Sequence, residues 1–227
     1  MSVEYLIVSI GTLSRNRLWG ESVPVRTAHA TTTYVVENHR RILVDPSLPA
    51  AALTARFNER TGGQLSDVTD VFCTTLRPVH RRSIEALAGA AWWVGEAELL
   101  SVRAHLEHVL ESADRLSPDD AHAVRADQAI LERFKPAPDK FSEQVSFYPL
   151  AGPSPGSAGL LLSPPTTTIV VAGDAVVTGE HLHRGQVWEG CADAEAAAES
   201  LQDLLEIADV IVPGHDNLLL TPRQNWL

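Results

Sequence analysis

The chain has 227 residues, a length that suits one large α/β domain or two small ones. Hydrophobic residues make up 44% and charged residues 21%, a balance typical of globular proteins and unlike that of disordered chains. The net charge of −11 disfavours nucleic acids and anionic membrane surfaces as partners. The net charge does not indicate a particular substrate, because a basic pocket can lie within an acidic protein.

The N-terminal segment and the cysteines bear on the location of the protein. The apolar run over residues 5–10 is brief and follows Glu4 without a basic leader, so we predict no signal peptide. No apolar stretch approaches the ~20 residues needed to cross a bilayer. Cys73 and Cys191 are far apart and form no CxxC pair, which favours inert thiols in a reducing compartment. We therefore expect a cytoplasmic protein.

The first half of the chain predicts a sheet with accompanying helices. Short segments rich in β-branched and aromatic residues are expected as strands at 5–10, 31–37, 41–45, 68–74 and 91–94. Apolar spacings of three and four, and a Gly62-Gly63 stop, predict helices at 49–60, 80–90 and from Glu96 onward. Residues 112–140 are polar and contain three prolines, so we expect a partly helical surface excursion.

The second half repeats the plan of the first. Strands are expected at 145–150, 159–162, 168–172 and 209–213, and a helix at 193–206. Its buried face is expected to hold Ala197, Leu201, Leu204 and Leu205. Each half is a hairpin ending in an aspartate (Asp45, then Asp174), followed by a helix and by a strand that delivers a loop. We predict one domain over 1–227, of the α/β (α+β) class, with two mixed sheets packed face to face and helices outside.

Five short motifs occur in a fixed order along the chain. They are Ile42-Leu43-Val44-Asp45, Cys73-Thr74-Thr75-Leu76-Arg77-Pro78-Val79-His80, Ala151-Gly152-Pro153-Ser154-Pro155-Gly156-Ser157, Val171-Ala172-Gly173-Asp174-Ala175 and Val212-Pro213-Gly214-His215. Together they resemble the metallo-β-lactamase superfamily, over roughly residues 31–221. The resemblance implies a four-layer αββα sandwich with a metal site where the strand ends of both halves converge.

The motifs depart from the superfamily at most metal-ligand positions. Where the superfamily carries the three histidines of its first metal, this chain has Thr75, Arg77 and Pro153, and its second-metal aspartate is replaced by Val79. The positions that match metal ligands residue by residue are His80, Asp174 and His215.

Arg77 disfavours a metal ion at the first site. A guanidinium about 4 Å from a dication costs roughly 8 kcal/mol of repulsion at an effective dielectric near 20. We predict that the Arg77 head group occupies the vacated first site and pairs with Asp174. The remaining His80, Asp174 and His215 are enough in number for one Zn²⁺, Fe²⁺ or Mn²⁺ ion.

Three functions are compatible with this pattern. The first is a non-catalytic or weakly active relative that binds a small molecule in the old cleft, where Arg77 would suit an anionic group. The second is a mononuclear hydrolase of an ester, thioester or lactone that uses His80, Asp174 and His215. The third is a structural role in oligomerisation. The net charge of −11 leads us to expect no nucleic-acid or membrane partner, and we leave a homo-oligomer open. The three functions stay open because the fold alone does not supply function.

Overall fold

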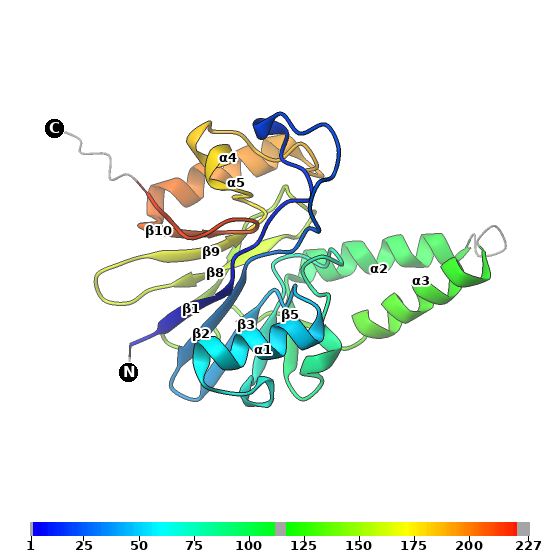
Figure 1. Cartoon of the computed structure of the whole chain (residues 1–227), viewed down its shortest axis with the longest axis horizontal. Helices are drawn as coiled ribbons and strands as arrows, with labels where there is room; N and C mark the ends of the chain where they lie inside the picture. Colours follow the sequence, from blue (N-terminus) through cyan, green and yellow to red (C-terminus); the bar gives the residue numbers. More distant parts are fainter. Residues whose placement is uncertain (1, 112–116, 222–227) are drawn as a thin grey trace.

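The computed structural model describes residues 2–111 and 117–221 and consists of two β-sheets packed face to face with helices outside them (Figure 1). The first sheet has the strand order β1-β2-β3-β4-β5-β6. Its strands are β1 (Glu4–Ser9), β2 (Thr32–Glu37), β3 (Arg40–Val44), β4 (Asp70–Phe72), β5 (Ala91–Val94) and β6 (Phe134–Pro136). The β1–β2 and β2–β3 pairs are antiparallel and the later pairs are parallel, so the sheet is mixed as predicted.

The second sheet has the strand order β11-β10-β9-β8-β7. Its strands are β7 (Val145–Pro149), β8 (Ala158–Leu162), β9 (Ile169–Gly173), β10 (Val210–Pro213) and β11 (Leu219–Leu220). Only the β9–β10 pair is parallel, so this sheet is mixed too. The helices are α1 (Ala50–Thr61), α2 (Glu96–Glu111), α3 (Pro118–Leu131), α4 (Gly179–His183) and α5 (Ala194–Ile207), with short 3-10 turns η1 (Arg17–Trp19), η2 (Leu65–Asp67) and η3 (Ile84–Leu87).

Three hydrophobic clusters of the described residues hold the layers together. The central cluster lies between the sheets and includes Val44 of β3 and Val171 of β9, both buried. A second cluster packs α1 and α2 on the first sheet, and a third packs α5 on the second sheet. Burial of these apolar faces is the main source of stability for such a layered arrangement. The predicted fold class is therefore confirmed.

Three expectations about local structure were wrong or incomplete. Residues 80–90 form turns and the 3-10 segment η3, not an α-helix. Leu205 is 38% exposed, because α5 turns only Ala197, Leu201 and Leu204 fully onto the sheet. The expected surface excursion at 112–140 contains β6, whose Phe134 is buried against Trp92, and α3 lies beside α2 in an arm that extends past the sheets (Figure 1). Residues 112–116 of that excursion lie outside the described residues.

The ends of the parallel strands determine where functional side chains can meet. β3 and β4 run parallel in one sheet, and β9 and β10 run parallel in the other. Asp45 directly follows β3, Asp174 directly follows β9, and His215 comes two residues after β10. Carboxyl ends of parallel strands lie at one edge of each sheet, so the loops that follow these strands leave each sheet at that edge. None of the described helices has the length and hydrophobicity of a membrane span; the cytoplasmic location stays a prediction.

Candidate metal centre

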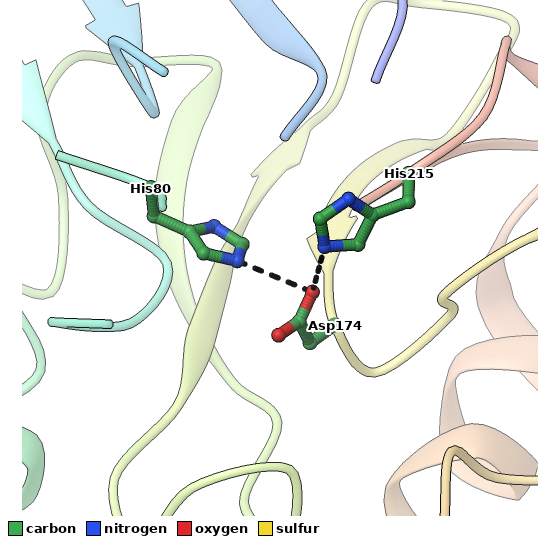
Figure 2. A group of neighbouring side chains, drawn as sticks. All are labelled: His80, Asp174 and His215. Carbon is green, nitrogen blue, oxygen red and sulfur yellow. Dashed lines mark ion pairs between the residues drawn. The ribbon is translucent and has the colours of Figure 1, made fainter. Parts of the chain in front are cut away.

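His80, Asp174 and His215 converge on one point, as Figure 2 shows. Asp174 Oδ1 lies 3.3 Å from His80 Nε2 and 3.3 Å from His215 Nε2. One ligand atom from each residue lies within 4.8 Å of the other two, and all three residues are buried. The predicted single-ion ligand set is therefore brought together in space, from a turn of the first half and two strand ends of the second.

Each histidine is anchored through its other ring nitrogen. His215 Nδ1 lies 3.2 Å from the carbonyl oxygen of Thr12 and 3.0 Å from that of His29. Carbonyl oxygens only accept hydrogen bonds, so Nδ1 donates and Nε2 of the neutral ring carries the lone pair. His80 Nδ1 lies 2.9 Å from Asp45 Oδ2, which fixes the same tautomer in neutral His80. A carboxylate or carbonyl behind the imidazole is the usual second layer of a metal site.

Asp45 is the residue that holds His80 in place. Its Oδ1 accepts a hydrogen bond from Thr74 N at 2.8 Å, and its Oδ2 accepts one from Thr74 Oγ1 at 2.7 Å. The backbone of Asp45 is left-handed, with φ of 50°. Local strain of this kind persists where surrounding contacts compensate for it. Asp45 thus links the end of β3 to the loop that carries His80.

The converging atoms lack hydrogen-bond partners. Neither 3.3 Å contact has hydrogen-bond geometry, and His80 Nε2 and Asp174 Oδ1 are both buried without a partner among the described residues. With neutral histidines, two imidazole lone pairs and a carboxylate oxygen face one another, an arrangement that is costly unless a cation lies between them. Two imidazoles and one carboxylate are a donor set that Zn²⁺ accepts. The residues therefore fit one divalent metal ion.

A proton on His80 can supply positive charge to the centre in place of a metal ion. Burial by itself lowers the pKa of His80, but the carboxylates of Asp174 and Asp45 outweigh it and raise the pKa to about 10. Burial raises the pKa of Asp174, but His80 and His215 outweigh burial and hold that pKa well below its ordinary value. The centre is thus built to hold a cation, and a metal ion and a proton compete for it.

Arg77 occupies the other side of Asp174. Its NH1 donates to Asp174 Oδ2 at 2.8 Å, which confirms the predicted ion pair. Its NH2 donates to the carbonyl oxygens of Pro153 and Gly190, and its Cζ lies 4.6 Å from the centroid of the Trp188 ring. Both terminal nitrogens are thereby engaged with the protein. A role of Arg77 in holding a ligand anion stays a prediction, and such an anion would have to compete with these contacts.

Gly173 and Gly214 allow the strand ends to approach the centre. Gly173 has φ of 54°, a left-handed backbone conformation that favours glycine. Gly214 is required for a different reason: a Cβ added there would lie 2.6 Å from Asp174 Oδ1. The absence of a side chain at Gly214 leaves room for the carboxylate that faces both histidines.

Comparison with solved structures identifies the architecture. The chain aligns with a protein from Thermotoga maritima classed with the metallo-β-lactamases at a TM-score of 0.70 and 18% identity, covering 97% of this chain and 100% of that chain. The chain has the metallo-β-lactamase fold. It is also similar to AidC, a dizinc quorum-quenching lactonase, at a TM-score of 0.66 and 17% identity, covering 87% of this chain and 76% of that chain.

A third similar structure is a mutant of AiiA from B. thuringiensis, solved with N-decanoyl-L-homoserine at its active site. The TM-score is 0.61 and the identity 17%, with 95% of this chain and 94% of that chain covered. No sequence-family model matches the chain, and no curated protein sequence matches it either. At these identities, the likeness establishes the metallo-β-lactamase fold and leaves the chemistry to the site itself.

Three of the positions at which the sequence resemblance would place metal ligands, Thr75, Val79 and Pro153, take part in hydrogen bonds within the protein. Thr75 Oγ1 donates to Glu98 Oε1 at 2.7 Å and accepts from Ser154 Oγ at 3.1 Å. Glu98 also accepts from Leu76 N at 2.9 Å and, through Oε2, from Gly156 N at 3.2 Å. The carbonyls of Val79 and Pro153 accept hydrogen bonds from Ser47 and Arg77.

Sequence reasoning missed Glu98, the backbone carbonyls behind His215, and Trp188. Glu98 lies in the first turn of α2, where an acidic residue is favoured for its interaction with the helix dipole, so nothing marked it as buried. The carbonyls of Thr12 and His29 leave no trace in a sequence. The only available signal for Trp188 was an aromatic residue in a loop between two recognised motifs.

Proposed function

We propose that this protein is a metal-dependent hydrolase that uses a single divalent ion to cleave an ester, thioester or lactone. The proposal depends on one observation: His80 Nε2 and Asp174 Oδ1 have no hydrogen-bond partner among the described residues, and they lie 3.3 Å apart beside His215 Nε2 in a buried centre. Zn²⁺ suits this donor set best, and Fe²⁺ and Mn²⁺ are also accepted by two imidazoles and a carboxylate.

The residues of the chain have distinct parts in this proposal. His80, Asp174 and His215 would hold the ion, and three protein ligands leave coordination positions open to a substrate. Asp45 orients His80, and the carbonyls of Thr12 and His29 orient His215. When bound, the ion polarises a carbonyl oxygen and lowers the pKa of water, which is the chemistry needed for hydrolysis at neutral pH.

The class of substrate is proposed from the solved structures of the same fold, and the expected level of activity from the number of metal ligands. AidC is a quorum-quenching lactonase, and AiiA holds N-decanoyl-L-homoserine at its active site, so lactones head the panel to be tested. Arg77, Thr75, Val79 and Pro153 supply no ligands for a second ion. We therefore expect activity below that of two-ion enzymes of this fold.

A second candidate is a metal-free protein that binds a small molecule without catalysis. The pKa of about 10 at His80 favours it, because a proton on His80 compensates Asp45 and Asp174 without any metal. The contacts that engage Arg77 make the centre internally compensated as well. In that case the fold is retained and only binding remains.

Metal analysis and hydrolysis assays separate the two candidates. We would purify the chain without chelator, measure Zn, Fe and Mn per chain, and assay lactones, thioesters and esters with and without added Zn²⁺. The variant His215→Ala should lose both metal and activity, whereas His105→Ala, an exposed histidine of α2, should retain them. A chain that takes up no metal on reconstitution would overturn the hydrolase proposal and favour the second candidate.

A further inference from the structure

The carboxylate of Asp174 has two oxygens, and each faces a different place for a positive charge: the proposed ion site on one side and the Arg77 guanidinium on the other. Oδ1 faces the point shared by the two histidines, at 3.3 Å from each Nε2. Oδ2 accepts the hydrogen bond from Arg77 NH1 at 2.8 Å. An ion at the centre and the guanidinium would therefore lie on the two oxygens of one carboxylate, within a few ångströms of each other. Like charges at such separations repel strongly in a buried site.

Arg77 cannot readily withdraw from this position. Its NH2 is held by the carbonyl oxygens of Pro153 and Gly190, and its head group stacks on Trp188. The Arg77 side chain is only 26% exposed, so solvent and salt screen its charge incompletely. A guanidinium also keeps its proton at every physiological pH. Arg77 is thus a fixed positive charge built into the wall of the centre.

The local charge count shows what Arg77 does to metal binding. Asp45 and Asp174 contribute two negative charges to the centre, and together they would balance one divalent ion. Arg77 neutralises one of them through its ion pair with Asp174. A divalent ion that binds therefore meets one uncompensated negative charge instead of two. No uncompensated carboxylate of this pair is then left for a second ion.

We propose that Arg77 sets the metal affinity of this centre, as a protein-borne cation that competes with the ion for Asp174. The inference rests on the proposed single-ion function but concerns a different property, the strength of binding. It assigns Arg77 a positioning role through Asp174, with no contact to substrate.

The test measures zinc dissociation constants by competition with a chromophoric chelator on metal-free protein. Arg77→Met removes the charge, and Arg77→Gln provides a second neutral variant; both should bind Zn²⁺ about tenfold more tightly or better. Arg77→Lys keeps the charge and should stay close to the wild type. Arg82→Met, which removes an exposed arginine nearby, is the matched control and should leave the constant unchanged. Tighter binding cannot arise from a damaged fold, because an unfolded chain lacks the converged ligands.

The outcomes separate this inference from the proposed function. If the wild type binds one ion and the neutral variants bind no more tightly, Arg77 does not set the affinity, and the single-ion proposal stands. If the wild type binds no ion and the neutral variants do, the role of Arg77 is supported and the single-ion function of the native chain fails. If none of the proteins binds an ion, both ideas are overturned.

Discussion

Proton competition at His80 leads to a quantitative prediction for metal binding. In the metal-free protein the pKa of His80 is about 10, so the ring is charged at pH 7. A metal ion needs the neutral imidazole, and its binding must therefore release that proton. At pH 7 the protonated form outnumbers the neutral form by ~1,000 to one, which weakens the apparent metal affinity by the same factor. The affinity should rise about tenfold per pH unit between pH 7 and 9.

The assay combines chelator competition at several pH values with calorimetry in buffers of different ionisation heat. The first gives the slope of affinity against pH, and the second counts the protons released per ion. Asp45→Asn removes one of the two carboxylates that raise the pKa of His80, so its slope should flatten at the upper end of this range. A wild-type affinity that does not change between pH 7 and 9, with no proton released, would refute the reasoning.

Two further predictions concern residues that shape the centre. Gly214→Ala brings a Cβ to 2.6 Å from Asp174 Oδ1, so it should weaken zinc binding about tenfold or more in the chelator assay. In the control Gly89→Ala the added Cβ meets nothing within 4 Å, so zinc binding should not change. Equal effects of the two substitutions would contradict the steric argument. Glu98→Ala leaves three buried donors without their acceptor and should lower the free energy of unfolding by about 2–4 kcal/mol in urea titrations. Glu96→Ala in the same helical turn should change it by about 0.5 kcal/mol or less, and a similar loss in both variants would show that burial of Glu98 is irrelevant.

The sequence was sufficient to predict most strands, because hydrophobic runs bounded by turns survive in a layered fold. It also predicted the meeting of His80, Asp174 and His215, and the ion pair between Arg77 and Asp174, both of which the structure confirms. These succeeded because strand ends in such folds converge on one edge, and because a buried carboxylate attracts the nearest cation.

The parts that could not be predicted depend on long-range packing. Residues 80–90 have helix-forming side chains, yet His80 is tied to Asp45 and Ser83 N to the carbonyl of Pro46, which holds the segment in turns. Tertiary contacts override local helix propensity in this way. The burial of Glu98 depends on Gly156, where an added Cβ would lie 1.9 Å from Glu98 N. Such a close approach between distant segments has no periodic signal.

The valines that fill the space between the sheets stand next to the ligand-bearing loops in the chain. Val44 precedes Asp45 directly, and Val171 and Val212 each come three residues before a ligand. We therefore expect the packing of this hydrocarbon layer to influence the spacing of the residues that would hold an ion. A related chain with bulkier or smaller residues in that layer would have to respace its ligands, so the interior and the centre are expected to change together over evolution.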